Sequence, residues 1–330
     1  MLKSWPGFVL VLCLLLVSIL TATYIIDKNN IIPINNLACD AGCLEIRLSR
    51  HIRILSEEIG ERHFENPGSL KKTADYIVQE WIAAGLQPVR QSYADNTYHN
   101  IIAEIRGSKK PDEIIIAGAH YDTVWLSPGA NDNASGVAAM LELSRNLVNR
   151  NPERTVRFVA FTNEEQPFAG SDEMGSVVYA RLLHQQGEHV IAMYSLEMLG
   201  YYSDKPGSQS YPVPLNWFYP DQANFIAFVG NIQSGYLLWR SLNAFRRHSD
   251  FPAQGLIMPE KLVPDIRRSD HASFWDAGYP AVMVTDTADF RNIHYHTVGD
   301  FMRTLDMKKM AGVVAGLTMM LADLAGVNED

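Results

Sequence analysis

The sequence contains few cysteines and no concentration of positive charge. Only three of its 330 residues are cysteines, at positions 13, 39 and 43. This is too few for a disulfide-rich secreted fold, and no histidine accompanies them at zinc-finger spacing. The formal charge is −9 and there is no Lys/Arg-rich run, so the basic face that nucleic acid binding needs is missing. Glycine and proline occur at ordinary levels, which excludes collagen-like and low-complexity chains.

One uncharged apolar run stands apart near the N-terminus. Residues 8–26 are 19 positions without a charge, preceded by Lys3 and followed by Asp27. A helix of this length extends about 28 Å, close to the hydrocarbon thickness of a bilayer. Residues 1–28 therefore predict either a retained membrane anchor or a cleaved secretory signal. In both interpretations the rest of the chain lies outside the cytoplasm, periplasmic or extracellular, and it is secreted if the segment is cleaved.

Residues 29–43 are predicted to form a polar linker. Cys39 and Cys43 are four residues apart within it, a spacing that allows a small disulfide in helical or turn geometry. Two free thiols are the alternative. Beyond the linker the sequence shows neither an internal repeat nor a second composition regime, so we expect one domain over residues 44–330.

Helical and extended patterns alternate through this domain. Apolar residues recur with helical spacing over 44–59, 69–84, 135–148, 176–186, 235–247 and 307–324, and strand-like runs cover 100–105, 113–119, 155–161, 189–196, 225–229 and 281–285. This alternation predicts an α/β fold with a mostly parallel, mixed central sheet flanked by helices on both faces. In such sheets, ligands bind beyond the carboxyl ends of the strands.

Three predicted strands are followed by acidic or histidine side chains. His120 and Asp122 come after the strand 113–119, and side chains two apart on an extended chain point the same way, so Asp122 can orient His120. Glu164 and Glu165 follow the strand 155–161; adjacent carboxylates repel, which favours a nearby cation. Glu197 ends an apolar stretch, where an unpaired carboxylate is costly to bury.

Two loops add further candidate ligands. Asp132 lies in a glycine-flanked loop before the helix 135–148, where an N-cap is the alternative role. His294 and His296 occur together near the C-terminal helix, which Asp300 is placed to cap. Two imidazoles and three carboxylates suit two zinc ions. Asp132 would bridge them, with His120 and Glu197 on one ion and Glu165 and His296 on the other.

The segments HYDT, GANDNASG, NEE, EMLG, SDHASFW and YHT, in this order, resemble metallopeptidase family 28, the co-catalytic zinc aminopeptidases with a single α/β domain. The resemblance covers nearly all of residues 44–330 and implies peptide substrates and two zinc ions per chain. It implies Glu164 as the general base and Asp122 as the acid that backs the first histidine. The metal-ligand positions that it implies are His120, Asp132, Glu165, Glu197 and His296. His296 is preferred to His294 because the family's ligand directly precedes a threonine.

The sequence also departs from the family pattern. Several members carry Asp at the position of Glu197, and the resemblance gives Asp270 and His271 no role. Some relatives are glutaminyl cyclases with one zinc ion, and a carboxypeptidase is a further alternative. Other relatives are receptors without metals, but all five ligands and the base are retained here, which argues against a non-catalytic ectodomain. Residues 201–221 either line the cleft or form a packed surface loop.

Overall fold

The structure, a computed structural model, describes residues 41–213 and 215–327. The predicted membrane segment and Cys39 lie outside the described residues. Cys43 is disulfide-bonded. Across the described ranges, we find no helix that is both long enough and apolar enough to span a bilayer.

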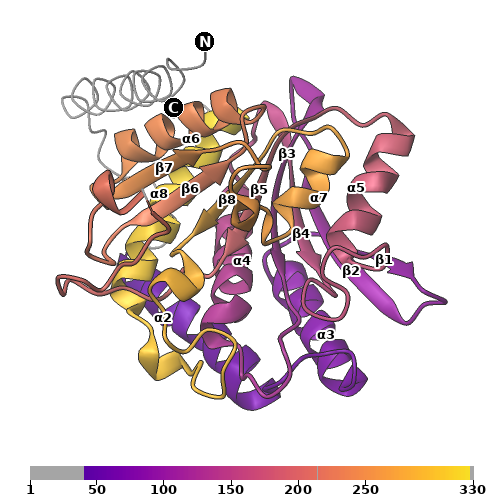
Figure 1. Ribbon diagram of the computed structural model, residues 1–330. Helices are drawn as coiled ribbons and strands as arrows, with labels where there is room; N and C mark the ends of the chain where they lie inside the picture. The colour runs from indigo at the N-terminus through magenta and orange to yellow at the C-terminus, as the bar shows by residue number, and fades with distance from the viewer. Residues whose placement is uncertain (1–40, 214, 328–330) are drawn as a thin grey trace, which may run out of the picture.

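Within the described residues, eight strands form one mixed sheet in the order β1-β2-β4-β3-β5-β8-β6-β7 (Figure 1). Their bounds are β1 Val89–Tyr93, β2 Tyr98–Ile105, β3 Lys110–His120, β4 Arg154–Phe161, β5 Val190–Glu197, β6 Ile226–Gly230, β7 Ala253–Ile257 and β8 Ala281–Thr285. The central strands β4, β3, β5 and β8 are parallel. Antiparallel pairs β1–β2, β2–β4 and β6–β8 surround them, which confirms the predicted mixed α/β sheet. The sequence reading missed β1 and β7.

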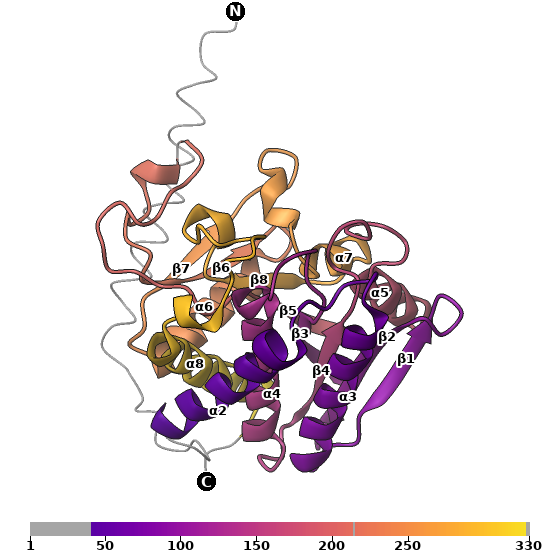
Figure 2. The same cartoon turned by 90° about the horizontal axis from the view of Figure 1, so that it is seen from below.

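Helices cover both faces of this sheet. They are α2 Ala41–Arg53, α3 Pro67–Ala83, α4 Gly136–Leu147, α5 Gly175–Gln186, α6 Gly235–His248, α7 His271–Asp276 and α8 Met307–Ala325. One core joins the sheet to α2, α3, α4, α6 and α8, and a second core joins the opposite face to α5 and α7. Figure 2 shows α5 and α7 on the other side of the sheet from α2, α4 and α8.

Strand β3 shows why both faces are buried. Ile115 and Ala117 face the first core, whereas Ile114 and Ile116 face the second, as the two-residue period of a strand requires. Its apolar run is therefore that of a central parallel strand covered by helices on both sides. Since β3, β4, β5 and β8 run in the same direction, their carboxyl ends meet at one edge of the sheet. His120 and Glu197 are the last residues of β3 and β5 at this edge.

Candidate metal centre

The carboxyl edge of the sheet brings the five predicted ligands together. Two groups of three share Asp132: one contains His120 and Glu197, and the other contains Glu165 and His296. In the first group, His120 Nε2 lies 3.3 Å from Asp132 Oδ1 and 3.3 Å from Glu197 Oε2. In the second, His296 Nε2 lies 3.1 Å from Asp132 Oδ2 and 3.3 Å from Glu165 Oε1. The two oxygens of one carboxylate thus face two different histidines.

Glu164 lies beside these groups, and Asp122 holds the backbone that carries it. Glu164 Oε2 is 3.9 Å from His120 Nε2. The backbone amides of Glu164 and Glu165 donate to the two oxygens of Asp122, at 3.2 and 3.0 Å. Asp122 Oδ1 also lies 3.6 Å from His120 Nδ1. One buried carboxylate therefore fixes the ends of two neighbouring strands, which goes beyond the orientation of His120 that the sequence predicted.

Because these acids are buried close together, their pKa values differ from the ordinary ones when no cation lies between them. Burial raises the pKa of Glu165 to about 7, and the charge of Asp132 adds to this effect. Burial also raises the pKa of Glu164 well above its ordinary value, with His120 acting in the opposite direction. Burial opposes the charged form of His296, but the neighbouring carboxylates of Asp132 and Glu165 raise its pKa to about 10. Positive charge in the histidines thus balances the negative charge of the acids.

The loop that carries Asp132 is held by a residue from the far end of the chain. Asp300 accepts hydrogen bonds from the backbone amides of Asn131 at 2.9 Å and Asp132 at 3.0 Å. The expectation that Asp300 caps the last helix is wrong, because α8 begins at Met307 and its N-cap is Asp306. Asp300 is close in sequence to the helix, which suggested the capping role. Its actual hydrogen-bond partners lie 168 and 169 positions away.

A buried arginine joins three segments beneath the same loop. The guanidinium of Arg62 donates to five backbone carbonyls at 2.8–2.9 Å; these belong to Leu55, Gly60, Tyr121, Pro128 and Gly129. The planar fork of five N–H donors makes this possible, and lysine has no equivalent. Arg62 thereby ties the chain after β3 to the chain before Asp132. Sequence reasoning missed it because a single arginine after a helix carries no recognisable motif.

The segment that contains Asp270 supports Glu197 through its neighbour. Ser269 Oγ donates to Glu197 Oε2 at 2.7 Å. Asp270 is fully buried and neither of its carboxylate oxygens has a hydrogen-bond partner within the described residues, and burial raises its pKa to about 7. His271 is also buried and lies 2.6 Å from the carbonyl of Ile266. Neither Asp270 nor His271 belongs to the metal-ligand groups that the described residues form.

The donor set fits zinc. Imidazole nitrogens and carboxylate oxygens are zinc ligands, and three protein ligands with an open position are typical of catalytic zinc sites. Glu165 Oε1 is buried, and its 3.3 Å contact with His296 Nε2 lacks the geometry of a hydrogen bond, so this oxygen accepts none from the described residues. A buried carboxylate oxygen without a donor is costly, and a cation between Asp132, Glu165 and His296 would satisfy it.

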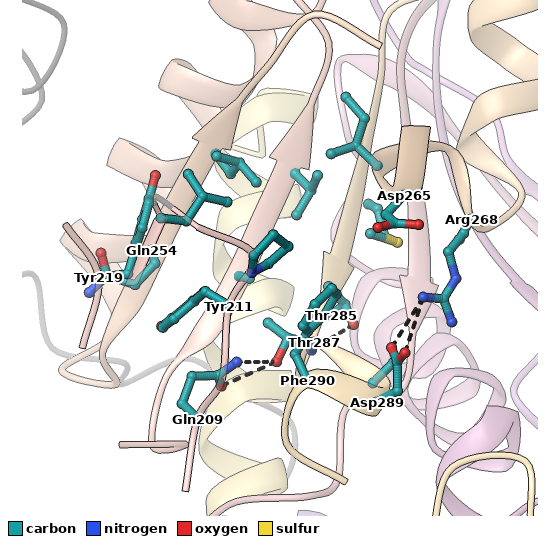
Figure 3. Close-up of a pocket in the computed structure, with 18 of the residues that line it drawn as sticks. Gln209, Tyr211, Tyr219, Gln254, Asp265, Arg268, Thr285, Thr287, Asp289 and Phe290 are labelled. Atoms are coloured by element: carbon teal, nitrogen blue, oxygen red, sulfur yellow. Dashed lines mark hydrogen bonds and ion pairs between the residues drawn. The ribbon is translucent and has the colours of Figure 1, made fainter. Parts of the chain in front are cut away.

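An apolar pocket adjoins this cluster on the face of β6, β7 and β8 (Figure 3). It encloses about 120 Å³, and its wall includes Tyr295 and Glu197, one of the five candidate ligands. Residues of all three strands line it, among them Ala227, Leu256 and Met283. Residues of the segment 201–221 also line it, namely Gln209, Tyr211, Pro212, Leu215 and Tyr219, so this segment forms a wall of the cleft.

Comparison with known proteins places the chain in a family. Residues 100–320 match peptidase family M28. The uncharacterized protein YfbL of Escherichia coli K12 is 39% identical over 286 residues, which cover 83% of this chain and 87% of that protein. A probable zinc metalloprotease of Leptosphaeria maculans is 25% identical, and the match covers 65% of this chain and 54% of that protein.

Solved structures show the same fold. The zinc aminopeptidase BSAP of Bacillus subtilis superposes with a TM-score of 0.67 at 16% identity, covering 87% of this chain and 95% of that one. A glutaminyl cyclase of Bacteroides thetaiotaomicron superposes with a TM-score of 0.62 at 19% identity, and the match covers 89% of this chain and 100% of that one. At these identities the likeness concerns the fold alone. The match over residues 100–320, together with the relationship to YfbL, shows that the chain belongs to peptidase family M28 and is a hydrolase of the metallopeptidase type.

Proposed function

We propose that the protein is a zinc-dependent aminopeptidase that holds two zinc ions and removes N-terminal residues from peptides. The observation that carries this proposal is the position of Asp132, whose two oxygens lie 3.3 Å from His120 Nε2 and 3.1 Å from His296 Nε2. A carboxylate shared in this way suits the bridging ligand of two metals. His120 and Glu197 would hold one ion, and Glu165 and His296 the other.

The residues around the cluster have separate tasks in hydrolysis. Zinc, when bound, supplies a Lewis acid that polarises the scissile carbonyl and brings the pKa of a water toward neutrality. Glu164 belongs to neither of the two triads that share Asp132, so its carboxylate would be free to accept a proton from the attacking water. The same carboxylate then returns the proton to the leaving amine. Asp122 keeps Glu164 in place through the backbone amides of Glu164 and Glu165.

The pocket beside Glu197 supports removal of single N-terminal residues with apolar side chains. It borders the cluster through Glu197 and Tyr295, and aromatic and aliphatic residues dominate the rest of its wall. A side chain seated there brings the adjoining carbonyl to the cluster and the free α-amine to its carboxylates. An acyl-blocked N-terminus lacks the ammonium charge that these acids attract.

Glutaminyl cyclase activity is the second candidate, because a glutaminyl cyclase shares the fold over 100% of its own chain and 89% of this one. The two triads around Asp132 favour two zinc ions over the single ion of cyclases. Metal analysis of the purified protein separates the two functions: about two zinc ions per chain support the aminopeptidase, and one favours the cyclase.

We also propose that residues 1–28 anchor the domain to a membrane, with the enzyme outside the cytoplasm. The uncharged run 8–26 supports this proposal. Cleavage of the segment would secrete the enzyme. Sequencing the N-terminus of the mature protein and fractionating membranes distinguish the anchor from the cleaved signal.

The decisive experiment measures release of N-terminal residues from unblocked peptides and amino-acid anilides. Turnover should stop on addition of a chelator and return with zinc. Glu164→Gln should lower kcat about 10²–10⁴-fold while the zinc content stays unchanged. Glu173→Gln, at an exposed glutamate in the following loop, is the matched control and should behave like the parent. The proposal fails if the parent turns over neither peptides nor anilides, or if Glu164→Gln retains full activity.

A further inference from the structure

His296 is the least enclosed of the five ligands. Its side chain is 36% exposed, whereas that of His120 is 1% exposed. Its backbone has φ of 55°, in the left-handed region that non-glycine residues adopt only when their surroundings impose it. Zinc-binding histidines are normally oriented by a hydrogen bond from the second ring nitrogen. His120 has the carbonyl of Asp122 3.2 Å from Nδ1, but no residue in the described part of the chain accepts a hydrogen bond from His296 Nδ1.

The ring of Tyr295 supplies a different support. It stacks on the imidazole of His296 with the ring centroids 3.8 Å apart and an angle of 21° between the planes. The Tyr295 hydroxyl accepts a hydrogen bond from Arg268 Nη2 at 3.0 Å. Arg268 Nη1 in turn lies 3.2 and 3.3 Å from the two oxygens of Asp289. Two segments of the chain therefore fix the aromatic ring that lies on the ligand.

The same three side chains belong to the wall of the apolar pocket. Tyr295, Arg268 and Asp289 all line it, together with the ligand Glu197. Figure 3 shows Arg268 and Asp289 paired at one side of the pocket, away from Tyr211 and Tyr219. A substrate side chain that fills the pocket would therefore press on the group that orients His296.

We infer that Tyr295 is a positioning residue: its ring, held by the Arg268–Asp289 pair, fixes the imidazole of His296 for the second zinc ion and joins that ion's site to the side-chain pocket. The inference rests on the proposed zinc function. In this inference an aromatic stack supports the exposed ligand His296, whereas a backbone carbonyl supports His120. Asp132, Glu165 and His296 form the affected site, and the site of His120 and Glu197 serves as an internal reference.

The test is a zinc titration of the purified full-length protein by competition with a chromogenic chelator, which needs no substrate. Tyr295→Leu should weaken binding of the second zinc ion about 10–100-fold, the range found for loss of groups that orient ligands. The affinity for the first ion should stay unchanged. Tyr295→Phe keeps the stack but loses the hydrogen bond from Arg268, so its loss of affinity should be smaller than that of Tyr295→Leu and similar to that of Arg268→Gln. Arg268→Gln, which frees the ring, should give an intermediate loss. His296→Ala sets the limit, with one ion bound.

A matched variant separates this role from a general effect on the pocket. Tyr211→Leu removes an aromatic wall that pairs with Tyr219 and lies on the other side of the pocket. It should raise KM for large N-terminal residues without changing either zinc affinity. Tyr295→Leu should lower kcat for small and large N-terminal residues alike.

The outcomes are distinguishable from those of the proposed function. If the parent binds two zinc ions and Tyr295→Leu binds both with parental affinity, the positioning role is wrong and the aminopeptidase proposal stands. Equal losses in Tyr295→Leu and Tyr295→Phe would also overturn it, because the stack would then not matter. A parent that binds no zinc at all overturns the proposed function, and this inference with it.

Discussion

Asp300 Oδ2 accepts a hydrogen bond from the backbone amide of Asp132 at 3.0 Å, across 168 positions of sequence. The same carboxylate accepts the amide of Asn131 through both oxygens, at 2.9 and 3.1 Å. The C-terminal part of the chain thereby sets the position of the carboxylate that faces both histidines. Metal binding should therefore depend on a residue that is not itself a ligand.

Replacing Asp300 with Asn should weaken zinc binding and destabilise the fold. The new NH₂ group would face a backbone N–H, and leaving one buried donor unpaired costs about 1–3 kcal/mol. Zinc affinity should fall about 10–100-fold, as with other groups that orient ligands. Asp306→Asn is the control: Asp306 accepts the backbone amide of Lys309 as the N-cap of α8, asparagine caps a helix equally well, and zinc affinity should stay parental. Equal zinc affinity in the parent and Asp300→Asn would contradict this role.

Asp122→Asn should lower kcat more than it changes KM. Both oxygens of Asp122 accept backbone amides, those of Glu164 and Glu165, and the substitution turns one acceptor into a donor. We expect kcat to fall about 10–100-fold at saturating zinc, because Glu164 loses its alignment. Steady-state kinetics on an amino-acid anilide would measure it. Asp112→Asn, at an exposed position on β3, should leave kcat unchanged; a parental kcat in Asp122→Asn would show that the amide contacts are dispensable.

Zinc affinity should rise with pH. Without a cation, burial disfavours the charged form of His296, but Asp132 and Glu165 outweigh this effect and raise its pKa to about 10. His120 is shifted in the same direction. Both imidazoles are thus protonated at neutral pH, and zinc must displace those protons. The affinity is highest near and above the raised pKa values and falls as pH decreases below them. Chelator competition at about pH 6, 7 and 8 tests this; an affinity independent of pH would contradict it.

Ala227→Leu should reduce activity on substrates with large N-terminal side chains more than on those with small ones. Ala227 lies on β6 with its side chain toward the pocket, and the larger side chain occupies space that a substrate side chain needs. One methylene of misfit in an apolar pocket changes kcat/KM about 10–200-fold, so leucine and phenylalanine anilides should lose at least that much relative to the alanine anilide. Zinc content should stay parental. A proportional loss for every anilide would show that the pocket does not select the side chain.

Most local elements, and the residue types that gather at the candidate site, can be predicted from the sequence alone. Apolar periodicity located most helices and strands, since burial on one face or both leaves a repeating pattern. Short polar motifs after β3, β4 and β5 identified side chains that the structure brings together, because parallel strands end at one edge. The short strands β1 Val89–Tyr93 and β7 Ala253–Ile257 lie at the sheet's margins and are only partly buried. Their apolar pattern is therefore weak, and the sequence reading missed them.

The residues that support the candidate ligands become recognisable only when distant segments of the chain are packed together. Asp300, Arg62 and Ser269 act through backbone amides, carbonyls or a single carboxylate oxygen far away in the chain, and such contacts leave no periodicity or motif. The stack of Tyr295 on His296 involves neighbours in sequence, but its support by Arg268 depends on how two loops pack. Hydrophobic patterns and motifs are local, because they reflect what each segment buries or binds. Strand direction and long-range hydrogen bonds arise only when segments distant in sequence pack together.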